Sequence, residues 1–90
     1  MAKEWRVFAH PDYFISIRSV IFNPDERFLV TTQIREYLKT IEKPSNDLLP
    51  VPGKLNQYYF DVMGYTVIIH WVKEYANDIR LLEIYLSVEE

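Results

Sequence analysis

Apolar and polar residues alternate near the start of the chain and again through its last third. Residues 4–10 follow a period of two and are ended by Pro11, so this segment is predicted to be a strand. Three later segments show the same alternation and are also predicted to be strands: 57–63, 65–74 and 79–88. Gly64 lies between the first two of these and marks a tight reversal, because such a turn often needs a positive φ angle.

Helical spacing of apolar residues predicts a long helix in the middle of the chain. Asn23 supplies a capping side chain, Pro24 suits the first helical position, and Glu26 completes the start signal three residues after the cap. The stripe expected to face the core is Val30, Ile34, Tyr37, Leu38 and Ile41. Pro44 is expected to stop the helix.

Residues 12–22 carry two conflicting signals. Phe14, Ile17 and Ile21 recur at helical spacing behind Pro11, which suits a helix start. The segment is also rich in β-branched and aromatic residues, which favour strands. A short helix is predicted here.

Two segments are predicted to be connections. Residues 45–54 contain two prolines and a glycine and form a turn-rich connector, in which Leu48, Leu49 and Val51 are expected to pack onto the rest of the molecule. Residues 75–78 are predicted to be a four-residue hairpin loop between the last two strands.

The pairing of the last three strands is predicted from burial, because a slip of one residue moves every side chain to the opposite face. Pairing Val62 with Tyr65, and Glu74 with Ile79, gives one continuous apolar face. The facing pairs on it are then Tyr58–Ile69, Phe60–Val67, Ile69–Ile84 and Trp71–Leu82. The large aromatic residues expected in the core are Tyr58, Tyr65 and Trp71, and the last strand is expected to contribute Leu82, Ile84, Leu86 and Val88.

The opposite face of this predicted sheet is left open and carries polar and aromatic side chains. In the chosen register His70 lies across from Glu83, and Ile68 lies near Tyr85. Tyr59 is expected on the same face.

The order of elements predicts an α+β two-layer fold. It consists of an N-terminal strand, one or two helices, a connector and a three-stranded antiparallel meander, with the helices on one face of the sheet. Ninety residues and about 10.8 kDa are suited to a single domain over residues 1–90.

Composition narrows the class of protein. The chain has no cysteine, which excludes disulfide scaffolds, thiolate zinc sites and cysteine nucleophiles. The N-terminal residues do not resemble a signal peptide, and no apolar run approaches the roughly 20 residues that span a bilayer, so a cytoplasmic protein without membrane contact is expected. The formal charge of −3 is unfavourable for binding through phosphate neutralisation.

The open face holds the candidate chemistry. His70 and Glu83 could act as an acid–base pair, with the carboxylate orienting the imidazole, and Tyr59 and Tyr85 could position a base or stabilise charge. The simpler interpretation, which the residue types favour, is an ordinary cross-strand polar pair on a solvated face. A lone histidine without a second ligand at metal-site spacing predicts no metal site, and no cofactor motif is present.

Two surfaces are candidates for binding. Residues Tyr59, Ile68, Leu81 and Tyr85 would form an apolar patch on the open face, which fits a protein partner or a second copy of the chain. The basic residues of the long helix, Arg27, Arg35, Lys39 and Lys43, are interleaved with glutamates. That spacing is typical of a solvated helix face rather than a nucleic-acid contact.

The run LNQYYFDVMGYTVII over residues 55–69, together with the order of elements, resembles the RelE/ParE-type toxin superfamily. In that family a leucine-bearing loop leads into a Tyr-containing strand, a glycine hairpin and a second strand that begins with tyrosine. The matching residues here are Tyr58, Gly64 and Tyr65, and residues 79–84 resemble the closing strand. Trp5-Arg6-Val7 followed by a proline is similar to the start of many members.

The resemblance implies the RelE/ParE fold, a bacterial source, an antitoxin-type partner protein, and activity as an mRNA interferase on the ribosome. Family members carry basic residues at positions where this chain has Tyr59, Asp61, Thr66 and Glu83. Of these, Asp61 and Glu83 are acidic and repel phosphate, so the resemblance implies the activity less firmly than the fold. Two functions therefore stay open: a toxin-like component of a toxin–antitoxin pair, or a catalytically silent protein-binding module of the same fold. The toxin-like function allows the chain to be an enzyme, whereas the binding module is not one, so the sequence leaves this question open.

Overall fold

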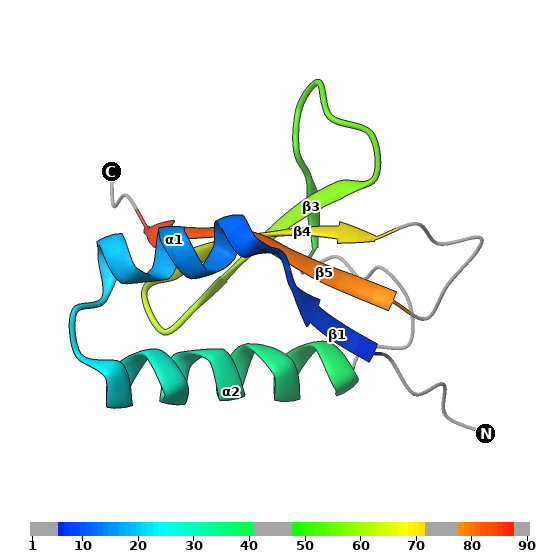
Figure 1. Ribbon diagram of the computed structural model, residues 1–90. Coiled ribbons are helices and arrows are strands. Elements are labelled where there is room, and N and C mark those ends of the chain that lie inside the picture. The colour runs from blue at the N-terminus through cyan, green and yellow to red at the C-terminus, as the bar shows by residue number, and fades with distance from the viewer. Residues whose placement is uncertain (1–5, 41–47, 72–77, 88–90) are drawn as a thin grey trace.

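The computed structural model describes residues 6–40, 48–71 and 78–87. Its elements, in chain order, are β1 (Arg6–Ala9), α1 (Pro11–Val20), α2 (Pro24–Thr40), β2 (Leu49–Pro50), β3 (Gln57–Val62), β4 (Tyr65–Trp71) and β5 (Asp78–Leu86) (Figure 1). The predicted helix stop at Pro44 lies outside the described residues, as do most of the predicted 75–78 loop and the predicted core residues Ile41 and Val88.

The strands form one five-stranded sheet in the order β1-β5-β4-β3-β2. The predicted α+β arrangement, with an N-terminal strand, helices and an antiparallel meander, is confirmed. Two features were not predicted: β1 runs parallel to β5, and Leu49–Pro50 forms an edge strand beside β3. A strand of two residues is too short to show alternation, so its sequence carries no periodic signal.

The short helix α1 is confirmed, but its buried face differs from the predicted one. Tyr13 occupies the core position expected for Phe14, which is 51% exposed, while Ile17 and Ile21 are buried as predicted. Positions 13, 17 and 21 follow the i, i+4, i+8 spacing of one helix face. The hydroxyl of Tyr13 forms a hydrogen bond with Thr31 Oγ1 over 2.9 Å, so its polar tip is satisfied inside.

The long helix α2 begins as the sequence predicts. The Oδ1 atom of Asn23 accepts hydrogen bonds from the backbone N–H groups of Asp25 (2.8 Å) and Glu26 (3.3 Å), which would otherwise be unpaired at a helix start. The members of its stripe that are buried are Val30, Ile34 and Leu38, and Tyr37 stacks on Phe60 at a centroid distance of 4.9 Å. None of the helices in the described part of the chain is long and apolar enough to span a membrane.

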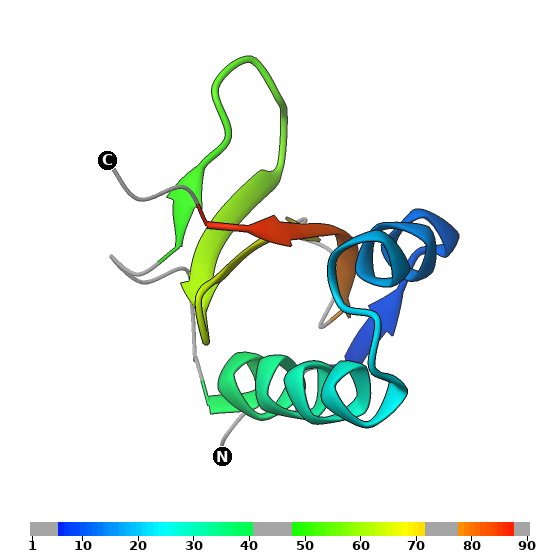
Figure 2. The same ribbon diagram turned by 90° about the vertical axis from the view of Figure 1, so that its left-hand side faces the viewer.

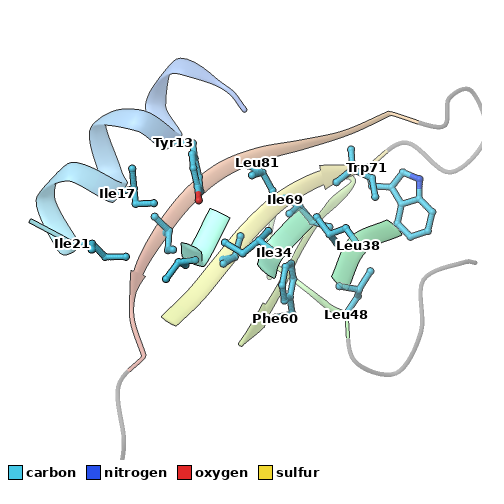
Figure 3. Packing of buried hydrophobic residues seen from close by; sticks show 14 residues of the cluster. Tyr13, Ile17, Ile21, Ile34, Leu38, Leu48, Phe60, Ile69, Trp71 and Leu81 are labelled. Atoms are coloured by element: carbon cyan, nitrogen blue, oxygen red, sulfur yellow. The ribbon is translucent and has the colours of Figure 1, made fainter. Parts of the chain in front are cut away.

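The core lies between the helices and one face of the curved sheet. Figure 2 shows α2 running along that face and α1 lying on the β1–β5 side of the molecule. Side chains from both helices and the sheet converge there, among them Ile17, Ile34, Phe60, Ile69 and Leu81 (Figure 3). Because α2 covers this face, the opposite face of β3, β4 and β5, hereafter the open face, is free to form a site.

The β3–β4 hairpin has the predicted register. Tyr58 pairs with Ile69, Phe60 with Val67, and Val62 with Tyr65. The two turn residues Met63 and Gly64 have φ angles of 52° and 83°, the pattern of a tight turn with two left-handed residues. The two-residue turn therefore sets the register of this hairpin.

The β4–β5 register differs from the predicted one. Ile69 faces Leu81 rather than Ile84, and Trp71 faces Ile79 rather than Leu82. Ile68 faces Glu83, so this part of β5 is shifted by two residues from the predicted pairing. A bulge that leaves Leu82 as an extra residue adds the third residue of the shift before Ile69. The bulge buries Leu81, which was expected on the open face, and leaves Leu82, which was expected in the core, half-buried at the open face. Leu86, also expected in the core, is 65% exposed at the end of β5.

Helix α1 covers the part of β5 that β1 does not reach. β1 pairs with β5 only from Asp78 to Leu81. Farther along β5, the hydroxyl of Ser16 donates a hydrogen bond to the carbonyl oxygen of Ile84 and accepts one from its N–H over 3.0 Å. One serine thus satisfies two backbone groups of an otherwise free sheet edge and attaches α1 to it.

Candidate functional site

The four predicted site residues come from three neighbouring strands, at positions that alternate with buried core residues. Tyr59 and His70 are half-buried beside the buried Phe60 and Ile69, so they point to the open face. Glu83 and Tyr85 flank the buried Ile84 and are exposed.

The predicted pairing of His70 with Glu83 is wrong. His70 lies across from Gln57 on β3 and Arg80 on β5, whereas Glu83 lies across from Ile68. The pairing of β4 with β5 is shifted from the predicted one by two residues at Glu83 and, past the bulge, by three at His70, so the imidazole has no carboxylate as its direct cross-strand neighbour. His70 and Glu83 are therefore diagonal neighbours on the open face rather than the direct partners that the sequence predicted.

A hollow of about 360 Å³ lies on the open face close to Glu83. The sheet contributes Ile68, Leu82 and Glu83 to its lining. The connector and the start of β3 contribute Val51, Lys54 and Gln57, and the start of α1 contributes His10 and Asp12. Of the four predicted site residues, only Glu83 lines it. Tyr59 and His70 are the cross-strand partners of the lining residues Ile68 and Gln57, and Tyr85 follows Glu83 along β5 on the same face.

His10 is held in place as the cap of α1. Its Nδ1 atom accepts a hydrogen bond from the backbone N–H of Asp12 over 3.1 Å, so the neutral ring carries its proton on Nε2. The Asp12 carboxylate lies 3.6 Å from the same Nδ1 atom and can pair with the protonated ring. Nε2–H is therefore a donor that α1 presents in a fixed orientation.

The polar groups of the hollow are chemically mixed. His10, Lys54 and the Gln57 amide offer donors, while Asp12 and Glu83 offer acceptors, around the apolar Ile68 and Leu82. A site of this kind can hold a polar ligand and can supply both a proton donor and a proton acceptor. Within the described ranges, no three His, Asp or Glu side chains gather in a geometry that could hold a metal ion.

Tyr85 is electrostatically linked to this site. Partial burial raises the pKa of its hydroxyl above the ordinary value of 10.0, and the nearby charge of Glu83 raises the pKa further. The phenol is therefore protonated at neutral pH and is available as a hydrogen-bond donor on the open face.

Removing the charge of Glu83 is expected to lower the pKa of Tyr85. In the Glu83→Gln variant the pKa should move back toward 10.0 without reaching it, since burial is the larger cause and is unchanged. The measurement is phenolate absorbance against pH, with the curve of a Tyr85→Phe variant subtracted to isolate this tyrosine. An unchanged pKa would show that the two side chains do not interact.

At the hairpin end of the open face, polar residues satisfy one another. Thr66 Oγ1 donates to Asp61 Oδ1 over 2.7 Å and shares a hydrogen bond of 2.9 Å with Ser87 Oγ. Asp61 and Thr66 are direct cross-strand partners. This pair occupies positions that the RelE/ParE resemblance associates with basic residues, and here it joins β3, β4 and the end of β5.

Sequence reasoning missed most of the hollow. His10, Asp12, Lys54 and Gln57 come from segments that the sequence places far from Glu83. Part of the signal was present, because His10-Pro11-Asp12 is a helix start and a cap is a natural place for a positioned side chain. The parallel β1–β5 pairing, which carries this cap to the open face, had no signal of its own.

No protein-family model matches the chain, and no curated protein matches it in sequence. The structure, in contrast, superposes on a chain from the crystal structure of the toxin–antitoxin complex RelBE2 from Mycobacterium tuberculosis. The TM-score is 0.73, and the match covers 99% of this chain and 98% of the other at 10% sequence identity. This protein has a RelE-type toxin fold.

The predicted resemblance to RelE/ParE-type toxins is thus confirmed at the level of the fold. An identity of 10% carries the RelE-type architecture but no individual side chain, so the chemistry of the open face rests on the residues of this chain alone.

Proposed function

We propose that this protein is the toxin-like component of a toxin–antitoxin pair, bound by a partner protein and acting in the cytoplasm on a macromolecular target. The observation that supports this most is the RelE-type fold, shared over nearly the whole length of both chains with a component of a toxin–antitoxin complex. The open face, with its hollow and the flanking aromatic residues, is the surface that we propose engages the target.

The target that we propose is ribosome-bound messenger RNA. Glu83 supplies a proton acceptor, and Lys54 supplies a cation for a phosphate, both at the hollow. His10 supplies the proton donor in its imidazolium form, with the Asp12 carboxylate 3.6 Å from Nδ1 as its partner. Tyr59, His70 and Tyr85 flank the hollow and offer rings and donors to a nucleobase. These roles are those required to move the proton of an attacking hydroxyl and to protonate the oxygen that leaves phosphorus.

The test is protein synthesis in a bacterial host after induced expression, followed by pulse-labelling with radioactive methionine. Wild-type protein is expected to stop labelling within minutes. Glu83→Gln is expected to relieve the arrest, since loss of an acid–base group lowers such a rate by about 100-fold or more. Tyr85→Phe is expected to relieve it partly, because it removes a hydrogen-bond donor beside the hollow. His70→Ala is expected to relieve it partly, because His70 lies outside the hollow.

Glu36→Gln serves as the matched control, because Glu36 is exposed on α2, on the other side of the sheet. It is expected to arrest synthesis like the wild type. Thermal melting of each purified variant separates loss of activity from loss of folding. Unimpeded synthesis in cells that contain abundant folded wild-type protein would contradict the toxin proposal.

A second candidate is a catalytically silent protein-binding module. The observation that favours it is charge: the open face carries Asp61 and Glu83, Asp12 lies at the hollow, and the whole chain has a formal charge of −3. Carboxylates repel the phosphates of RNA and suit a basic protein surface. Folded protein without arrest would support this candidate.

A further inference from the structure

A groove of about 330 Å³ lies between α1 and α2, separate from the hollow on the open face. Tyr13, Ile17 and Thr31 are among the residues that line it. The groove is therefore formed by the two helices of the fold, and none of its lining residues is shared with the proposed RNA site.

The groove is bordered by large apolar side chains that face water. Phe14 and Phe28 both line it, and Phe28 is 75% exposed. Phe22, in the short connection between the two helices, is 84% exposed. Single exposed apolar residues are ordinary, but phenylalanines gathered at a concave surface indicate an interaction site.

The charges of the groove have one sign. Its two charged lining residues are Arg18 and Arg27, and neither forms an ion pair with a carboxylate of the described residues. Within the described ranges, the buried Nε–H of Arg27 has no hydrogen-bond partner, and its Nη2 makes a long bond of 3.5 Å to the carbonyl oxygen of Phe22. A guanidinium at an apolar groove, without a carboxylate partner among the described residues, matches an incoming carboxylate, which can accept from its Nη groups.

We propose that this groove binds a helix of the partner protein through its apolar face, with an aspartate or glutamate of that helix pairing with Arg27. A groove between two helices fits the ridges of a third, and amphipathic helices bind such grooves through residues at i, i+3 or i+4, and i+7. A second copy of this chain fits less well, because a two-fold contact across this face would bring the arginines of both copies together. The identification of this partner as an antitoxin rests on the proposed function.

A library of amphipathic helical peptides displayed on phage provides the probe. Selection against immobilised wild-type protein is expected to enrich helices with an apolar stripe that contains one acidic residue. The enriched peptide and its counterpart with glutamine in place of the acid are then measured by fluorescence anisotropy against wild type, Arg27→Met, Phe28→Ser and Lys39→Met.

Loss of the peptide acid is expected to weaken binding to the wild type about tenfold, and Arg27→Met should weaken binding of the acidic peptide equally. The two changes together should cost no more than either alone, which identifies the acid and Arg27 as a pair. Phe28→Ser should also weaken binding, whereas Lys39→Met, on an exposed part of α2 outside the groove, should not.

Enrichment of peptides without an acid would overturn the proposal, and so would affinities that Arg27→Met and Phe28→Ser leave unchanged. The proposal would also be overturned if the wild type self-associates in analytical sedimentation and Phe28→Ser abolishes that association, because the groove would then bind a second copy of the chain. If the peptides do not bind but the wild type still arrests protein synthesis, the groove proposal is contradicted and the toxin proposal is not. Peptide binding without arrest would support the groove and contradict the toxin proposal.

Discussion

The Ile69→Ala variant is expected to lose about 3 kcal/mol of unfolding free energy, because truncating a fully buried isoleucine removes apolar contacts and leaves a cavity. Ile69 lies in the central strand β4, where it pairs with Tyr58 on one side and Leu81 on the other. Both neighbours are held by strand pairing, so the structure has little freedom to collapse into the space. The measurement is urea-induced unfolding followed by circular dichroism.

Ile15→Ala provides the matched control, since Ile15 has the same chemistry but is 67% exposed on α1. Its expected effect is below about 0.5 kcal/mol. Equal losses in the two variants would show that Ile69 is not at the centre of the core. The Ile69→Ala loss is also large enough to lower the amount of folded protein in cells, so it can relieve arrest without touching the site.

The Ser16→Ala variant is expected to destabilise the protein by about 2 kcal/mol, because it leaves both the carbonyl and the N–H of Ile84 without their partner. It should also loosen α1 from β5, and with α1 the His10 cap at the hollow. Hydrogen exchange is the sharper measurement, since the Ile84 amide should exchange much faster in the variant than in the wild type.

Ser19→Ala is the control for this prediction. The Ser19 hydroxyl donates only to the carbonyl of Ile15 within the same helix and is exposed, so its loss should change stability by less than about 0.5 kcal/mol. An Ile84 amide that exchanges equally slowly in the Ser16→Ala and Ser19→Ala proteins would rule out the proposed role of Ser16.

The elements that could be predicted from the sequence are those whose signals are local. Asn23 and Glu26 lie within one turn of each other, and the spacing of Val30, Ile34 and Leu38 is repeated by a single helix. In the β3–β4 hairpin the two-residue turn leaves only one register. Backbone geometry and nearest neighbours are sufficient in each case.

The register of β5 could not be predicted because the strand is apolar on both sides of its bulge. Leu81, Leu82 and Ile84 give no sign of which two face the core, and uninterrupted alternation chooses Leu82 and Ile84. The structure buries Leu81 and Ile84, since the bulge places both against the helices. A two-residue shift of the pairing, together with the bulge, set His70 opposite Arg80 and Glu83 opposite Ile68, and of these two predicted residues only Glu83 lines the hollow.

The sequence by itself determined the order of elements, the caps and stripes of the helices, the β3–β4 hairpin and the side of the sheet on which Tyr59, His70, Glu83 and Tyr85 lie. These features follow from interactions over a few residues or from the two-residue period of a strand. Only the tertiary structure decided that His10 and Lys54 meet Glu83 at one hollow, and that Arg18 and Arg27 meet between two helices. The physical reason is distance along the chain, because these groups are brought together by the parallel β1–β5 pairing and by helix packing, which no local pattern encodes.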